Sequence, residues 1–185
     1  MNKKYELTDE KRTLADGTVL HRIRAVRDFT SADGMEVKEG DRGGWIEKED
    51  NLSHYGDAWV SGEARVYGEA RVYGDALVYG EAWVYGNARV SGEAEVSGIH
   101  DYAVFKNVWS SGRWFTYTRS DRMWKVGCFR GTGDELVAKA YKDSELSGRC
   151  YEAIVLAQEA IDSAVEAAEK REREAGAEAA GERVR

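Results

Sequence analysis

The sequence has few of the residues that support disulfide bridges, metal clusters or membrane spans. Its 185 residues include two cysteines, Cys128 and Cys150, which lack CxxC spacing and are expected to be ordinary buried thiols. No apolar run approaches the roughly 20 residues of a membrane-spanning helix, and no apolar segment follows the lysines near the N-terminus. We therefore expect a soluble, cytoplasmic protein without a membrane partner.

Signatures of catalysis and of nucleic-acid binding are also missing. The chain has three histidines and shows no Ser-His-Asp order, phosphate-cradling glycine loop or metal-ligand cluster. Its net charge of −7 argues against a general binder of phosphate backbones, although a local basic face is compatible with it. We expect no cofactor, no metal site and no catalytic residue.

What the sequence has in abundance is a six-residue repeat. From Gly56 the chain reads GDAWVS, GEARVY, GEARVY, GDALVY, GEAWVY, GNARVS and GEAEVS, so glycine, alanine and valine each recur without a slip. A six-residue period matches neither the 3.6 residues of an α-helical turn nor an array of hairpins. It predicts very short strands, joined at corners where glycine accepts a backbone that a Cβ would strain.

Each hexad, with a valine followed four residues later by an alanine, resembles the repeat of left-handed parallel β-helices. In that family three hexads form a triangular coil of about 18 residues in which the valines point inward. We predict a mainly β fold: a short left-handed parallel β-helix of hexapeptide repeats, flanked by a small N-terminal β-module, an aromatic β-hairpin and C-terminal α-helices. Seven hexads give a little over two coils, so both ends need covers.

The outward side chains sort into three faces, because residues 18 positions apart are expected to stack about 4.8 Å above one another. Two faces combine arginine with aromatic rings: Arg65, Tyr67, Trp83 and Tyr85 on one, and Arg71, Tyr73 and Arg89 on another. The remaining face carries Trp59, Leu77 and Glu95. Arginine and aromatic rings together suit a partner protein or a planar ligand.

The alternative is that the tyrosines only pack well across strands while the arginines balance the acids at the corners. Those acids are expected to be solvated: Asp57, Glu63, Glu69, Asp75, Glu81 and Glu93.

The segments beside the repeat are predicted to cover its ends. Upstream we expect short strands over residues 18–26, 35–41 and 43–47 and a hairpin turn at Asp16-Gly17, with Trp45, Ile46 and Leu52 leading into the first coil. Downstream, strands over residues 114–118 and 123–129, joined by the turn 119–122, form a cap with an aromatic core. The alternative for this segment is a basic binding pocket made of Arg113, Arg119, Arg122, Lys125 and Arg130.

The C-terminal part is predicted to be helical. Thr132 and Glu135 have the spacing of a capping box. A second helix carries a stripe that packs on the body or pairs with another subunit, made of Leu146, Cys150, Ile154, Ala157, Ile161, Ala164, Val165 and Ala168. Residues 170–185 are expected to be a frayed helix or a disordered tail. The predicted division is 1–53, 54–98, 99–131, 132–169 and 170–185.

Several motifs resemble a group of phage- and prophage-encoded hexapeptide-repeat proteins, some of them labelled polymer-forming. The likeness covers most of residues 5–155 and rests on residues 21–25 (HRIRA), 43–47 (GGWIE), 51–54 (NLSH) and 122–129 (RMWKVGCF), together with the YG-type hexads. The resemblance implies a viral or mobile-element setting, hence the cytosol of a host cell. By analogy with other small accessory proteins of this kind, it also implies counter-defence.

Two classes of function remain open. The leading hypothesis is a non-catalytic binding or inhibitory protein that uses its arginine and aromatic surfaces, acts as a homo-oligomer, and takes a host protein or a small anionic or nucleotide ligand. The alternatives are a self-assembling structural protein or a hexapeptide-type acyltransferase. For the latter, His54 stands where a valine would precede the first hexad and His100 where an alanine would follow the last. A histidine at a repeat boundary more often caps the stack.

Overall fold

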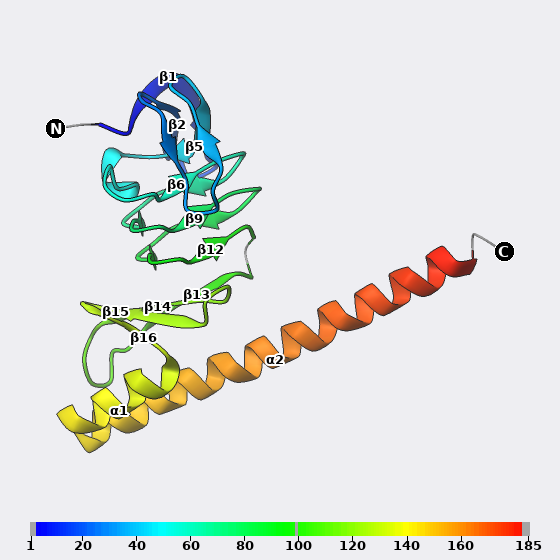
Figure 1. Cartoon of the computed structure of the whole chain (residues 1–185). Helices are drawn as coiled ribbons and strands as arrows, with labels where there is room; N and C mark the ends of the chain where they lie inside the picture. Colours follow the sequence, from blue (N-terminus) through cyan, green and yellow to red (C-terminus); the bar gives the residue numbers. More distant parts are fainter. Residues whose placement is uncertain (1–2, 99, 183–185) are drawn as a thin grey trace. The chain divides into compact units, whose positions relative to one another are not determined.

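The protein is mainly β, with two helices at its C-terminal end (Figure 1). The computed structural model describes residues 3–98 and 100–182, and the side chains through residue 177. Two compact units divide the chain at Leu136 and Val137. Ile99, where the repeat was predicted to break, and the last three residues of the predicted tail lie outside the described residues.

The N-terminal segment forms a small β-module. A hairpin of β1 (Tyr5–Thr13) and β2 (Val19–Ala25) turns at Asp16-Gly17, as predicted, with the Asp16 carboxylate accepting a bond from the Thr18 N–H at 2.9 Å. Strand β2 pairs antiparallel with β5 (Arg42–Ile46), and β3 (Phe29–Thr30) pairs with β4 (Glu36–Val37). Strand β1 was not predicted, because seven of its nine residues are polar and hide its alternation.

Each of the seven hexads contributes one two-residue strand, and strands three hexads apart pair in parallel. The strands are β6 (Trp59–Val60), β7 (Arg65–Val66), β8 (Arg71–Val72), β9 (Leu77–Val78), β10 (Trp83–Val84), β11 (Arg89–Val90) and β12 (Glu95–Val96). Arg65 faces Trp83 and Arg71 faces Arg89, so the predicted spacing of 18 residues is confirmed. The strands belong to three separate short ladders and not to one closed sheet.

We call the paired hexad strands of residues 56–97, together with the strand levels that precede them, the stack. Its core consists of the valines and alanines of the hexads. All seven valines and all seven alanines of the hexads are buried. Because each valine side chain meets those above and below it, the burial of apolar area, at about 25 cal/mol per Å², accumulates along the stack. Each repeat glycine has a positive φ, and a Cβ on Gly56 would lie 2.5 Å from the Gly74 carbonyl oxygen, so the corners require glycine.

The stack has one more level than the hexads alone provide. Ile46 pairs with Val66 and Leu52 bridges to Val72, each 20 residues away instead of 18. Leu52 and Val60 are eight residues apart, so two extra residues lie in the corner after Leu52. We had placed His54 at the inward position; this insertion moves it out, and the buried side chain there is Leu52.

The segment after the repeat is a four-stranded antiparallel sheet. Its strands are β13 (Tyr102–Lys106), β14 (Trp114–Thr118), β15 (Met123–Val126) and β16 (Phe129–Gly131). The predicted pairing of residues 114–118 with the next strand is confirmed. That second strand is shorter than predicted because Gly127, with φ of 59°, starts a turn. This turn exposes Cys128, and Cys150 is half-buried, so the prediction of two buried thiols is wrong.

The chain ends in two helices, α1 (Gly133–Asp143) and α2 (Glu145–Glu182). The predicted capping box is confirmed: the Glu135 carboxylate accepts from the Thr132 N–H, and the Thr132 hydroxyl accepts from the Glu135 N–H. Helix α2 continues to Glu182, where a frayed or disordered tail had been predicted. Its buried positions are Tyr151, Val155, Gln158 and Asp162, whereas Leu146 and Ile161 of the predicted stripe are exposed.

Candidate binding surfaces

The lower-numbered end of the stack is closed by three polar side chains that bind backbone carbonyls. Buried Lys4 donates to the oxygens of Gly56 and Ala58 at 3.1 and 2.6 Å, and buried Asn51 donates to those of Gly68 and Ala70 at 3.1 and 2.8 Å. Arg22 donates to the Gly62 oxygen at 2.8 Å. These backbone carbonyls, which would have accepted hydrogen bonds from a further coil, therefore accept them from side chains of this chain.

The higher-numbered end of the stack is closed by three hydroxyl groups. One binds the last strand of each ladder: β10 in the ladder of β7 and β10, β11 in that of β8 and β11, and β12 in that of β6, β9 and β12. The Tyr102 hydroxyl donates to the Trp83 carbonyl at 2.8 Å on the first ladder. The Arg89 N–H donates to the Thr116 hydroxyl at 3.0 Å on the second, and the Glu95 N–H donates to the Ser120 hydroxyl at 2.8 Å on the third. Because both ends are occupied by the chain itself, the sides of the stack are the surfaces left for a partner.

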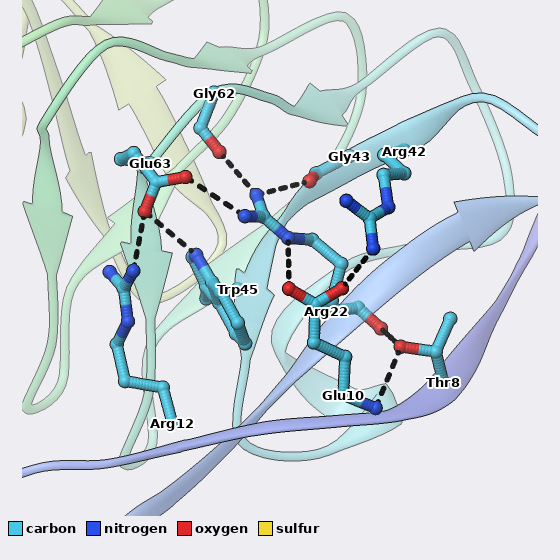
Figure 2. A network of polar contacts seen from close by, with 9 residues as sticks. All are labelled: Thr8, Glu10, Arg12, Arg22, Arg42, Gly43, Trp45, Gly62 and Glu63. Atoms are coloured by element: carbon cyan, nitrogen blue, oxygen red, sulfur yellow. Dashed lines mark hydrogen bonds and ion pairs between the residues drawn. The ribbon is translucent and has the colours of Figure 1, made fainter.

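A polar network fixes the N-terminal module to the stack (Figure 2). The Glu63 carboxylate accepts from Arg22 at 2.9 Å, from Arg12 at 2.7 Å and from the Trp45 indole N–H at 3.2 Å. The Arg22 hydrogen bond, followed by those of Arg12 and Trp45, lowers the pKa of Glu63 to about 2. This corner acid thus pairs with cations of the module and not with the hexad arginines; Glu69 likewise binds Lys48 at 2.7 Å.

Beside this network lies the first predicted surface, Arg65, Tyr67, Trp83 and Tyr85, to which the structure adds the buried Trp45; we call this set the tryptophan face. Arg65 faces Trp45 on one side and Trp83 on the other, and its guanidinium lies 4.4 Å from the Trp83 ring centre. The Tyr67 and Tyr85 rings stack at 5.4 Å and 11°. Trp83 and Tyr85 are 41% and 46% exposed, so rings held in place by their neighbours still present half of their surface to solvent.

Two open hollows flank the tryptophan face. One, of about 490 Å³, lies between the β1–β2 turn and the stack and is lined by Arg12, Leu14, Asp16, Arg65, Tyr67 and Trp83. The other, of about 370 Å³, is lined by Tyr85, Asn87, Tyr102, Val104 and Trp114. Arg12, Tyr102 and Trp114 were not predicted at these hollows, because hexad spacing does not determine which flanking strands contact the stack. The aromatic density after residue 100 was the available signal.

The second predicted surface consists of Arg71, Tyr73 and Arg89, and the structure adds Lys125; we call this set the arginine face. Arg71 and Arg89 are exposed and directly opposite each other on β8 and β11. Lys125, on β15, has its ammonium group 5.9 Å from the Tyr73 ring centre. Beside Arg71, Tyr73 and Arg89 is a hollow of about 410 Å³. The structure thus brings two members of the predicted distal pocket to the stack, Lys125 and Arg130, whose guanidinium lies against Gly92.

Of the other members of that predicted pocket, Arg130 lies opposite Lys125 on β16, and Arg113, Arg119 and Arg122 lie elsewhere. Arg113 precedes β14 and Arg119 follows it, so the strand separates them. Arg122 is exposed and lies in the next turn with φ of 53°. Arg130 binds Asp121 at 2.9 Å. Arg113 is therefore not gathered with Arg119, Arg122 and Lys125 into one site.

The third face is largely covered. Trp59 and Leu77, which we had placed outward, are buried; Phe29 and Tyr5 pack against Trp59 at ring-centre distances of 5.1 and 6.4 Å. The N-terminal module uses this side of the stack for its own packing. Of these three residues, Glu95 keeps the exposed position that the repeat predicted, and Tyr79, which was also placed on this face, is 38% exposed.

The histidines are placed at the edges of the fold. His54 stacks on Tyr5 at 4.3 Å, and its Nδ1 accepts from the Lys4 N–H at 3.3 Å; burial lowers its pKa. His21 contacts the Thr8 carbonyl at 3.1 Å, and His100 is exposed. Within the described residues, no group of three or more His, Cys, Asp or Glu side chains is arranged to hold a metal ion.

Comparison with known proteins gives one partial match. A family model described as YdcK beta solenoid repeat matches residues 70–86, which include β8, β9 and β10. Over that segment the chain is similar to β-solenoid repeat proteins, in agreement with the parallel ladders. No curated protein matches the chain. None of the described helices is apolar over a length that would cross a membrane.

Proposed function

We propose that this is a non-catalytic binding protein that docks a partner protein on its tryptophan face. The observation that carries the proposal is the alternation of Trp45, Arg65 and Trp83 along one ladder beside the stacked pair Tyr67 and Tyr85. Trp, Tyr and Arg are the residues that most often dominate the energy of protein–protein interfaces. Here they are ordered before any partner arrives, which lowers the entropy cost of binding.

The charge of the face selects the chemistry of the partner. Arg65 forms no ion pair within residues 3–98 and 100–182, and its buried Nε has no hydrogen-bond partner there. An acidic side chain of the partner would satisfy this guanidinium, while an adjacent apolar side chain would cover the exposed ring of Trp83. We propose an acidic segment with apolar neighbours, on a host protein, as the ligand.

We also infer that the repeat is a left-handed parallel β-helix. The pairing of residues 18 apart, the buried valines and the glycine corners with positive φ support this assignment, as does the match to a solenoid repeat. The closed ends favour a discrete binding protein over an open, end-to-end polymer.

Site-specific photo-crosslinking tests the docking surface. A photoreactive residue is placed at position 85, and the matched control carries it at position 79, because Tyr79 is a repeat tyrosine of similar exposure, 38%, on another ladder. In host lysate, position 85 should capture a discrete protein that position 79 does not. Capture should disappear with Trp83→Ala or Arg65→Glu and persist with Tyr79→Ala. Equal capture at both positions would contradict the proposal.

We further propose that α2 joins copies of the chain. Leu146, Leu156 and Ile161 are large apolar side chains that stand exposed on a 38-residue helix. Light scattering after size-exclusion chromatography should give a multiple of the 20.7 kDa chain mass, and Leu156→Glu with Ile161→Glu should return the monomer. A wild-type mass of one chain at all concentrations would refute this part.

A further inference from the structure

The arginine face contains an electrostatic conflict. Arg71 and Arg89 are direct neighbours on a parallel ladder, and both side chains are exposed. Like charges in this arrangement destabilise a sheet. Within the part of the chain that the structure describes, neither guanidinium forms an ion pair or a side-chain hydrogen bond. The nearby Glu69 is held instead by Lys48 at 2.7 Å.

The hollow beside these arginines is lined by side chains of both signs. Arg71, Tyr73 and Arg89 line it together with Glu49, Asp50 and Tyr55. Glu49 is paired with Lys3 at 2.6 Å, and Asp50 is exposed. A ligand suited to this lining has an anionic group for the arginines and hydrogen-bond donors for Asp50.

An aromatic ring completes the hollow because of the two-residue insertion after Leu52. The inserted corner carries Tyr55, which is 74% exposed, the highest value among the large hydrophobic side chains of the described residues. A standard hexad has one residue between its valine and the next glycine, whereas Ser53, His54 and Tyr55 all lie between Leu52 and Gly56. Tyr55 and Tyr73 thus offer two rings beside the paired arginines, and rings of this kind bind planar ligands by stacking.

We propose that the Arg71–Arg89 pair binds the dianionic phosphate of a ring-bearing phosphate monoester of the nucleoside monophosphate class. Two guanidinium groups one strand spacing apart match a group with two negative charges and offer several N–H donors to its oxygens. The ring stacks on Tyr55 or Tyr73, and its amino or hydroxyl groups donate to Asp50. This site is on a different ladder from the tryptophan face and does not depend on the proposed protein partner.

Calorimetric titration of the full chain with the four common ribonucleoside monophosphates tests the site, with the corresponding nucleosides and inorganic phosphate as reference ligands. At least one monophosphate should bind saturably below about 1 mM, and its nucleoside and inorganic phosphate about tenfold more weakly or not at all. Arg71→Gln and Arg89→Gln should each weaken the monophosphate about tenfold or more. Arg173→Gln, an exposed arginine of α2, should leave it unchanged.

Two further measurements keep the outcome decisive. Tyr55→Ala should weaken the monophosphate without changing the response to inorganic phosphate. At low salt, Arg71→Gln and Arg89→Gln should raise the melting temperature slightly, because each relieves the repulsion, which also shows that the variants fold. The proposal is overturned if no monophosphate binds, if inorganic phosphate binds equally well, or if Arg173→Gln has the same effect as Arg89→Gln.

Discussion

The regular repeat, residues 56–97, and the irregular segment before it, residues 44–55, build levels of the same stack from different kinds of sequence. In the repeat the inward residues are valine and alanine and every corner has a glycine, while its polar side-chain contacts, such as those of Glu63 and Glu69, lie at the surface. In the irregular segment, Ile46 and Leu52 replace valine, and Asn51 and the inserted corner add polar and aromatic groups. Repetition thus supplies the scaffold, and departures from it supply the ends and the hollows.

The strongest test of this difference replaces Asn51 with leucine. Asn51→Leu keeps the branching and the number of non-hydrogen atoms of the buried side chain but leaves the carbonyls of Gly68 and Ala70 without their donor. Each orphaned group costs about 1–3 kcal/mol, so the free energy of unfolding should fall by about 3 kcal/mol or more in urea titration. Asn87→Leu, the same replacement at a corner of the repeat, should change it by less than about 0.5 kcal/mol. Equal losses would show that the two segments do not differ in this way.

A second test compares two corners. Gly56→Ala and Gly86→Ala both place a Cβ on a left-handed backbone, which costs about 1–2 kcal/mol. Only at Gly56 does the new Cβ also meet the next level, 2.5 Å from the Gly74 oxygen, whereas Gly86 has open space. We expect about 1–3 kcal/mol of additional loss at Gly56 in thermal or urea unfolding. A larger loss at Gly86 would mean that the levels do not approach as described.

The sequence predicted the features that repeat and missed those that occur once. Hexad spacing was enough to place the valines inside and to pair Arg65 with Trp83, because each error would have to recur seven times. Hexad spacing could not place His54 or Leu52, because an insertion of two residues is recognised only when the strands before and after it are known. The Lys4 and Asn51 caps are single polar residues in unremarkable context, and the burial that makes them important is a property of the tertiary fold.

The same limit applies to the candidate surfaces. The residues of the tryptophan face that belong to the hexads were predicted from their register. Arg12, Tyr102 and Trp114 come from flanking segments whose position the six-residue period does not determine. Trp59 and Leu77 were misplaced for the same reason, since an outward position becomes buried once Phe29 and Tyr5 pack over it. A local sequence pattern predicts on which side of a strand a side chain lies, but it does not predict which other segment packs against that side.

Because Lys4 is buried at the closed end of the stack, we expect the free energy of unfolding to depend on pH in the alkaline range. Burial lowers the pKa of Lys4 from 10.5 to about 8, partly offset by Asp57. Between pH 8 and 10.5 the unfolded chain therefore holds more protons than the folded one, and stability rises with pH. Burial also raises the pKa of Tyr5, and that of Tyr102 to about 12, which reverses the slope above about pH 10.

Urea unfolding from pH 7.5 to pH 9.5 measures this slope, with the pH values chosen to bracket the shifted pKa of Lys4 at about 8. Wild type should become more stable as pH rises, and Lys4→Met, although less stable overall because Gly56 and Ala58 lose their donor, should show no such rise. Lys48→Met removes an exposed lysine that binds Glu69 and should keep the wild-type slope. If Lys4→Met keeps the rise of stability with pH, that rise comes from another titratable group.

The smallest expected effect concerns the corner acids in the acidic range. Because Arg22, Arg12 and Trp45 lower the pKa of Glu63 to about 2, the folded state binds fewer protons than the unfolded one below pH 4.5, and stability decreases as pH falls toward 2. The carboxylate is partly exposed, so solvent screening reduces its contribution to about 1 kcal/mol or less. Glu63→Gln should flatten the acid limb of the stability profile. Glu69→Gln, at a corner with the single partner Lys48, should flatten it less, and the reverse order would contradict the role of the module in holding this corner.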